Sequence, residues 1–160
     1  MSKPTLDSTL QEVKDYLHEH QAKGVDCPAC DRFVKVYQRN LNAGIVINLF
    51  GFYAADREAS GNYIHVYELM KSGETYFNME YAKLGWWKMI EKKPHVEGEK
   101  KSSGFWRITE KGRNFADELI SVPAKAHIYD DRIVGYSEEH TKIREALGKK
   151  FDYQVLMGRV

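Results

Sequence analysis

The spacing of apolar residues along the first half of the chain predicts helices. In the first of them, apolar residues recur at intervals of three and four: Leu6, Leu10, Val13 and Leu17. This spacing puts them on one face of a helix. Asp7 or Ser8 would cap that helix, and Gly24 would end it. A longer helix is expected over residues 31–56, with a kink at Gly44.

Shorter helices are expected after glycine-containing breaks at residues 60–62 and 72–74. Asn62 would cap a helix over residues 63–71. Asn78 would cap a third helix that runs to about Trp86.

Two strands and another helix follow. The segments 89–96 and 105–109 are rich in apolar, aromatic and β-branched residues, and a polar turn separates them. Thr109 or Glu110 then opens a helix that continues to Ile120.

The last forty residues have a different pattern. Residues 126–136 predict a β-hairpin with Asp130 and Asp131 at its turn. Residues 139–147 predict a short helix that Gly148 ends. The remaining tail carries apolar residues that need burial, either on their own domain or on a second subunit.

The order of helices, paired strands and helix is that of a winged helix-turn-helix. The run FWRITEKG at residues 105–112 resembles the second wing strand of that family and the start of the helix after it. The run WKMIE at residues 87–91 resembles the exit from the family's recognition helix, with Lys88 standing where glycine is usual. The resemblance covers roughly residues 42–120, and what it implies is a DNA-binding fold.

The chain is therefore predicted to be α+β and mainly helical. Its parts would be an N-terminal helical extension with the CPAC motif (residues 1–41), a winged-helix domain (residues 42–121) and a C-terminal hairpin-helix unit (residues 122–160). The whole chain also resembles uncharacterised small phage and bacterial proteins with an N-terminal CPxC and such a C-terminal unit. That second resemblance implies an origin and no activity.

Composition narrows the class of protein. The 160 residues are 42% hydrophobic and 29% charged, as in ordinary globular proteins. No apolar run approaches the roughly 20 residues of a membrane span. The two cysteines make no disulfide framework, and the N-terminus does not resemble a secretory signal. A cytoplasmic protein without a membrane partner is expected.

Positive charge is concentrated in one segment. Residues 83–113 hold nine Lys or Arg and four Asp or Glu, an excess of five, whereas the net charge of the whole chain is +1. In a winged helix this segment would meet DNA through the recognition helix and the wing. The residues expected to contact DNA are Asn78, Tyr81, Lys83, Lys88, Lys100, Lys101 and Arg107. The alternative is a solvated, lysine-rich hairpin that protects a sheet edge.

A second basic stripe precedes this segment. Arg32, Lys35 and Arg39 are three and four residues apart, which places them on one face of the helix expected over residues 31–56. They would extend a DNA footprint or form a solvated helix face.

Cys27 and Cys30 form a Cys-x-x-Cys pair, which is half of a tetrahedral zinc site. His18 and His20 would have to complete it, but two positions apart on a helix they point in different directions. A redox pair and two structural residues at a helix start are the alternatives. No other cofactor is expected.

Two aromatic residues close the expected recognition helix. Trp86 and Trp87 are expected in the core, because large aromatic side chains usually anchor it. A tryptophan on the surface would instead indicate a protein interface.

The chain has no Gly-rich phosphate loop, no His-Glu-x-x-His and no nucleophile elbow, so no enzyme is expected. The leading hypothesis is a winged-helix DNA-binding protein, a small transcriptional regulator of phage or bacterial origin. Its partners would be double-stranded DNA and a second copy of the chain, since paired half-sites give small readers specificity. The alternative is a non-enzymatic protein-interaction module that binds or inhibits a host nucleic-acid or defence enzyme.

Overall fold

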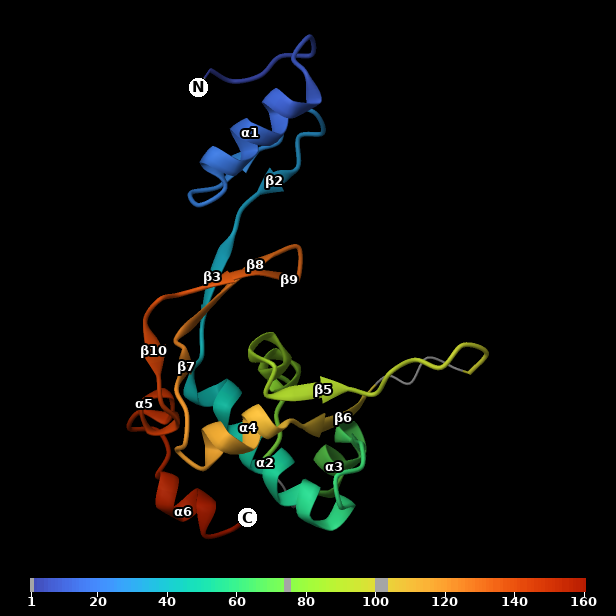
Figure 1. Ribbon diagram of the computed structural model, residues 1–160, viewed down its shortest axis with the longest axis vertical. Coiled ribbons are helices and arrows are strands. Elements are labelled where there is room, and N and C mark those ends of the chain that lie inside the picture. Colours follow the sequence, from blue (N-terminus) through green and yellow to red (C-terminus); the bar gives the residue numbers. More distant parts are fainter. Residues whose placement is uncertain (1, 74–75, 100–103) are drawn as a thin grey trace. The chain divides into compact units, whose positions relative to one another are not determined.

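A computed structural model describes residues 2–73, 76–99 and 104–160 (Figure 1). The helices are α1 (Leu10–His20), α2 (Ala43–Ala59), α3 (Val66–Ser72), the 3-10 helix η1 (Tyr81–Trp87), α4 (Glu110–Ala116), α5 (Ile143–Leu147) and α6 (Tyr153–Met157). The strands are β1 (Val25–Asp26), β2 (Phe33–Val34), β3 (Tyr37–Asn40), β4 (Ile64–His65), β5 (Ile90–Lys92), β6 (Phe105–Ile108), β7 (Val122–Pro123), β8 (Lys125–Tyr129), β9 (Arg132–Tyr136) and β10 (His140–Thr141).

The protein is α+β, with 39% of the described residues in helices and 20% in strands. The expectation of a mainly helical chain is therefore wrong. The strands form several small sheets of two or three strands each rather than one large sheet. Every helix in the described part of the chain falls short of the length or apolar content needed to cross a bilayer.

The chain divides into two compact units. The first unit combines Met1–Arg39 with His127–Tyr136, and the second combines Asn40–Ala126 with Ser137–Val160. Residues 122–160, expected as one C-terminal unit, thus contribute to both.

Helix α1 of the first unit begins at a capping box. The Thr9 hydroxyl accepts a hydrogen bond from the Glu12 backbone N–H (3.2 Å), and the Glu12 carboxylate accepts one from the Thr9 N–H (2.6 Å). Since this reciprocal pair satisfies two helix-end donors, the helix starts later than Asp7 or Ser8 would have placed it. Val13 on its buried face packs with Cys27 and Val34.

The segment before α2 is extended rather than helical, so the helix expected over residues 31–56 is wrong in its first half. Val25 pairs with Val34 and Asp26 with Phe33 in a short hairpin. Asp31 has φ 61°, a left-handed conformation that ends the turn of this hairpin and is incompatible with a continuous helix. Helix α2 starts only after Asn42, whose side chain accepts a hydrogen bond from the Ile45 N–H (3.0 Å).

The predicted C-terminal hairpin is confirmed. Strands β8 and β9 are joined at Asp130 and Asp131, with φ values of 49° and 58°. Two successive left-handed residues are typical of the turn that best matches the twist of a two-stranded hairpin. Strand β8 also pairs with β3, which makes a three-stranded sheet in the order β3-β8-β9.

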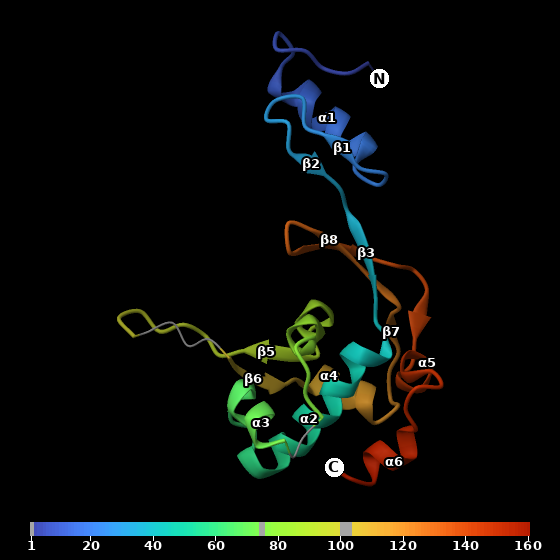
Figure 2. The same ribbon diagram turned by 180° about the vertical axis from the view of Figure 1, so that it is seen from behind.

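The second unit is built around α2, which packs against η1, α4, α5 and β6 (Figure 2). Most of this helix is buried, as its run IVINLF requires, which is apolar except for Asn48. Trp87 from η1 is 0% exposed, and its indole N–H donates to the Pro123 carbonyl oxygen at 2.7 Å. The expected core position of Trp87 is thus confirmed, whereas Trp86 is half-buried.

Strands β4, β6 and β5 form an antiparallel sheet in that order. Ile64 pairs with Trp106, and Ile90 pairs with Ile108. Both expected strands around the polar turn are present, although β5 ends at Lys92 rather than Val96. The pairing of residues 64–65 with β6 also explains why α3 begins at Val66, capped by His65 rather than Asn62.

The third helix, expected over residues 78–86, is a 3-10 helix that begins at Tyr81. The Asn78 side-chain oxygen accepts a hydrogen bond from the Glu80 N–H (2.8 Å), which is a turn two residues long and not a helix cap. The bond from Lys83 N–H to the Glu80 carbonyl (3.1 Å) then spans three residues. The expected α-helix is therefore replaced by a tighter and shorter element.

Thr109 and Gly112 explain the ITEKG motif. The Thr109 hydroxyl caps α4 by accepting from the Gly112 N–H (3.1 Å), and it donates to the Lys88 carbonyl (2.7 Å). A Cβ at Gly112 would overlap the Met89 carbonyl oxygen and lie 2.9 Å from a side-chain carbon of Ile108. Only glycine allows α4 to pack this closely on the strand pair.

The C-terminal tail docks on its own unit. Ile143, Leu147 and Leu156 are buried, and the Tyr153 hydroxyl donates to the Ala116 carbonyl at 2.6 Å. Leu156 and Tyr153 of the tail thus pack within the chain, and exchange with a second subunit stays a prediction.

Candidate nucleic-acid interface

The junction between η1 and β5 turns at Lys88. This residue has φ 59° and ψ 28°, the left-handed conformation for which glycine is the preferred residue. Its N–H donates to the Gly85 carbonyl (3.1 Å), and its side chain is exposed. The turn expected with glycine is thus formed with lysine, which places a cation on the surface at the end of η1.

Two further cations lie at the end of β5 (Lys92) and just after it (Lys93). The Lys92 amine lies 6.0 Å from the centre of the Trp106 ring, and the Lys93 amine lies 5.3 Å from that of Phe105. Because Phe105 and Trp106 are consecutive residues of β6, the two amines lie over opposite faces of the sheet. Both lysines are exposed, and neither forms an ion pair with any residue that the structure describes, so the aromatic rings beneath them leave their charge unneutralised.

Lys111 is a basic neighbour that the sequence did not single out as a contact residue. It lies in the first turn of α4 and is half-buried. Burial lowers the pKa of Lys111, and the nearby positive charge of Lys88 lowers that pKa further. The effect of Lys88 on this pKa places the two amines in one region. In the sequence, the signal for Lys111 was its place in the ITEKG motif.

Arg107, by contrast, is already paired. Its guanidinium lies 2.5 Å from the Glu91 carboxylate and 4.3 Å from the centre of the Tyr63 ring. The hydrogen bond that Arg107 donates to the Glu91 carboxylate raises the pKa of Arg107 above its ordinary value. A phosphate would have to displace Glu91 before Arg107 could bind it.

Asn78 is committed to an internal network with Asn48. Its side-chain N–H₂ donates to the Gly44 carbonyl (2.8 Å), and its side-chain oxygen accepts from the Asn48 amide (2.9 Å). Because these groups are occupied, Asn78 positions the start of η1 rather than presenting an amide to a base edge.

The other two residues expected to read DNA from η1 also have partners. The Tyr81 ring packs 6.4 Å from Phe52 and 6.3 Å from Trp106, measured between ring centres. Lys83 forms an ion pair with Glu80. Among the residues that the structure covers, the cations of this region that carry no acidic partner are therefore Lys88, Lys92, Lys93 and the half-buried Lys111.

Lys100 and Lys101, the expected contacts at the wing tip, lie outside the described residues. The chain leading to them is described as far as Glu99. Figures 1 and 2 show it continuing beyond β5 away from α2.

The stripe of Arg32, Lys35 and Arg39 belongs to the first unit and is not on a helix, so the expected helical face is wrong. Lys35 and Arg39 flank Tyr37 along an extended segment. The Lys35 amine and the Arg39 guanidinium lie 5.4 Å and 5.5 Å from the centre of its ring. Arg32 is exposed in the loop before β2.

Cys27 and Cys30 lie in the turn of the β1–β2 hairpin, with Cys27 8% exposed and both thiols free. Hydrogen bonds from the backbone N–H groups of Ala29 and Cys30 lower the pKa of the Cys27 thiol. The His20 Nδ1 is turned to the Tyr16 carbonyl oxygen at 2.8 Å. Among the described residues no three His, Cys, Asp or Glu side chains gather to hold a metal, and a tetrahedral zinc site needs four ligands.

Comparisons with known proteins add no relative. A scan against protein-family models, a search of curated proteins and a search of solved structures each found no match to this chain. The winged-helix resemblance rests on the motifs at residues 87–91 and 105–112 and on the order of elements.

Proposed function

We propose that the second unit is a winged-helix domain that binds double-stranded DNA, and that the protein is a small transcriptional regulator of phage or bacterial origin. The succession of α2, β4, α3, η1, β5 and β6 supports this, as does the strand order β4-β6-β5. In this assignment η1 takes the place of the recognition helix, and the wing is the one expected over residues 95–107, of which the structure describes 95–99 and 104–107.

The observation that carries the proposal is the set of unneutralised cations at the η1–β5 junction and on β5: Lys88, Lys92 and Lys93. Phosphate contacts by Lys and Arg supply most of the affinity of sequence-independent DNA binding. These three amines lie at the two places where a winged helix meets the backbone of DNA, the end of its recognition helix and its wing.

Base reading would be limited in this site. Asn78 and Tyr81 are engaged within the protein, and Arg107 is paired with Glu91. Backbone contacts position a protein on a duplex but carry no direct sequence information. We therefore infer that affinity comes mainly from phosphates and that discrimination among sequences is modest.

The test is fluorescence anisotropy of a labelled random-sequence duplex at two salt concentrations. The wild type should bind at low salt and lose affinity steeply as salt rises. The variant Lys92→Glu/Lys93→Glu should bind weakly and show a salt slope smaller by about 2, since each lost phosphate contact removes about 0.9 from it.

A matched control uses another adjacent pair of exposed lysines. In Lys149→Glu/Lys150→Glu the charge change is identical, and Lys150 also lies over an aromatic ring, Phe151, at 5.8 Å. Duplex affinity should fall far less in this variant than in the β5 variant. Equal losses of duplex affinity in the two variants would mean that net charge alone causes the effect and that the wing is not part of the interface.

The alternative is a non-enzymatic protein-interaction module that binds a host nucleic-acid or defence enzyme. Its candidate contact is Met79, which is 76% exposed and lies two residues before η1. If the wild type binds no duplex even at low salt, the regulator proposal fails. Substituting Met79→Glu in a pull-down of host proteins would then be the measurement to make.

A further inference from the structure

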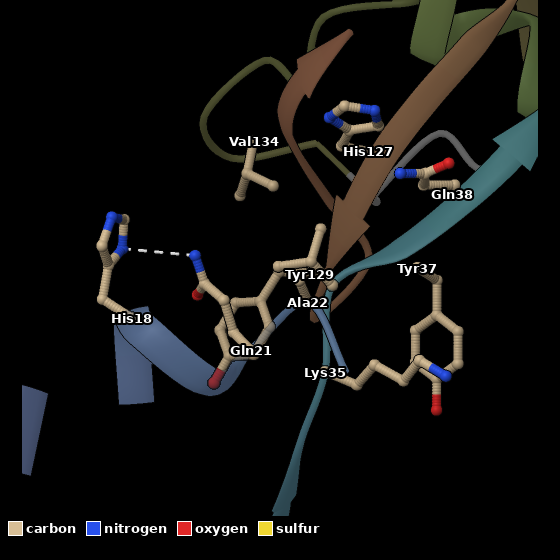
Figure 3. A pocket seen from close by; sticks show the side chains of 10 residues that line it. His18, Gln21, Ala22, Lys35, Tyr37, Gln38, His127, Tyr129 and Val134 are labelled. Atoms are coloured by element: carbon tan, nitrogen blue, oxygen red, sulfur yellow. Dashed lines mark hydrogen bonds between the residues drawn. The ribbon is translucent and has the colours of Figure 1, made fainter. Parts of the chain in front are cut away.

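The first unit contains a pocket of about 770 Å³ that the proposed duplex interface does not use (Figure 3). Its lining includes His18 and Gln21 from the end of α1, Lys35 just before β3, Tyr37 from β3, and His127 and Tyr129 from β8. The volume is within the range of about 300–1,000 Å³ that small-molecule sites occupy.

Strand alternation produces this lining. In β8, Ala126 and Ile128 are buried, so His127 and Tyr129 lie on the opposite face of the strand. Every residue of β3 is exposed, which means that Tyr37 serves no core. Tyr37 is 45% exposed and Tyr129 is 39% exposed.

The pocket is suited to an anion. Among the described residues that line it, none is Asp or Glu. Lys35 supplies a cation to the lining, and Arg39, outside the lining, lies near the same Tyr37 ring. A phosphate could take either cation without displacing a carboxylate, in contrast to Arg107 in the second unit.

The same pocket also offers flat surfaces and paired donors and acceptors. Tyr37 and Tyr129 present aromatic rings, and His18 with Gln21 present ring nitrogens and an amide, joined by a contact of 3.2 Å. A ligand that combines a phosphate with a planar, hydrogen-bonding ring system uses all of these groups. An acidic peptide would use the cations and leave the tyrosines without a stacking partner.

We propose that this pocket of the first unit binds a nucleotide, met either as one unit of an unpaired nucleic-acid strand or as a free mononucleotide. Base stacking on tyrosine and phosphate pairing with Lys35 and Arg39 are the two contributions that bind it. The inference does not depend on duplex binding by the second unit, because the residues that carry it belong to the first.

The test is anisotropy of a labelled oligothymidylate of about 15 nucleotides, within the length that one strand-binding module covers. Titrations at low salt use the full chain, and unlabelled AMP and dTMP serve as competitors. Tyr37→Ala and Tyr129→Ala should each weaken binding about tenfold, as expected for loss of one stacked base. Tyr37→Phe should bind as the wild type does, because it keeps the ring.

The matched control is Tyr67→Ala. Tyr67 is an exposed tyrosine of α3 with the Lys71 amine 4.6 Å from its ring centre, and so repeats the Lys35–Tyr37 arrangement outside the pocket. This variant should leave strand binding unchanged. Circular dichroism melts of all variants establish that each remains folded.

The outcomes separate the sources of the ligand. Binding of free nucleotides is supported if AMP and dTMP compete with the strand for the wild type and this competition is lost in Tyr37→Ala and Tyr129→Ala. Strand binding without such competition supports an unpaired strand. Absence of both, or alanine variants that bind like the wild type, overturns the proposal. Strand binding that is lost in Lys92→Glu/Lys93→Glu and kept in Tyr37→Ala also overturns it, since the wing would then hold the strand.

Discussion

Asn48 and Asn78 hydrogen-bond each other twice. The Asn78 backbone N–H donates to the Asn48 side-chain oxygen (2.7 Å), and the Asn48 amide donates to the Asn78 side-chain oxygen (2.9 Å). Asn48 is fully buried in α2, so this pair connects the central helix to the segment that starts η1. The contact determines where the predicted recognition element begins.

Substituting Asn48→Leu should lower the free energy of unfolding by about 2–3 kcal/mol, because Asn78 loses two partners and its polar groups are left unsatisfied. Urea denaturation measures this change. Asn62→Ala, at an exposed position, should change stability by less than about 0.5 kcal/mol. A neutral Asn48→Leu would mean that the pair does not hold the segment in place.

Gly112→Ala should destabilise the second unit by about 3 kcal/mol or more, because the added methyl group overlaps the Met89 carbonyl and the core cannot open there without cost. Gly44→Ala is the control. A Cβ at Gly44 would have its nearest neighbour, the Asn42 side-chain oxygen, at 3.4 Å. Gly44→Ala should therefore raise the free energy of unfolding by at most about 1 kcal/mol. Thermal melts of both variants decide whether close packing at residue 112 matters.

Lys88→Gly should raise the free energy of unfolding by about 0.5–1 kcal/mol, because glycine adopts the left-handed conformation without the strain of a side chain. The same substitution should weaken duplex binding, since it removes an amine from the proposed interface. Lys88→Ala separates the two effects: it also removes the amine, but it keeps a Cβ and should bring no gain in stability. If glycine and alanine variants are equally stable, the backbone at residue 88 is not strained.

The Glu118–Arg144 ion pair should make stability depend on pH. The hydrogen bond from Arg144 lowers the pKa of Glu118 below its usual 4.5. A carboxyl whose pKa is depressed by folding stabilises the protein above its unfolded pKa, and that contribution is lost as pH falls through the folded pKa. The melting temperature of Glu118→Gln should therefore be lower than that of the wild type at neutral pH.

The gap between Glu118→Gln and the wild type should close as the solution is acidified below about pH 4.5, and melts from about pH 7 to about pH 3 measure it. Glu97→Gln, at an exposed position that forms no ion pair with any residue the structure describes, should show no such closing gap. A constant difference for Glu118→Gln over this range would contradict the ion pair.

Treatment with a strong zinc chelator should leave the melting temperature unchanged. The described residues bring no third metal ligand near Cys27 and Cys30, and two thiols do not close a tetrahedral site. A fall in melting temperature that added zinc restores, and that Cys30→Ser abolishes, would establish a metal site at the hairpin turn.

Short-range signals predicted much of the second unit. The strand at residues 105–108 and the Thr109 cap follow from neighbouring residues, since a β-branched and aromatic run gives way to a hydroxyl that caps the next helix. The hairpin turn at Asp130 and Asp131 is local in the same sense. Candidate cations at Lys88 and around β5 were also visible, because charge and order of elements can be read along the chain.

The sequence by itself therefore determined the Thr109 cap, the turn at Asp130 and Asp131 and the strand at residues 105–108, whose signals lie within a few residues, but it misplaced other helix caps and the end of β5. Only the tertiary structure decided that residues 33–40 are extended, because apolar residues at 33, 37 and 41 fit a helical spacing while strand pairing with the distant β8 decides the conformation. It also decided that Asn78 and Arg107 are engaged internally, and that Tyr37 and Tyr129 line one pocket. The reason is physical: such contacts join residues 16 to 92 positions apart, and no periodicity along a chain records which distant groups will meet.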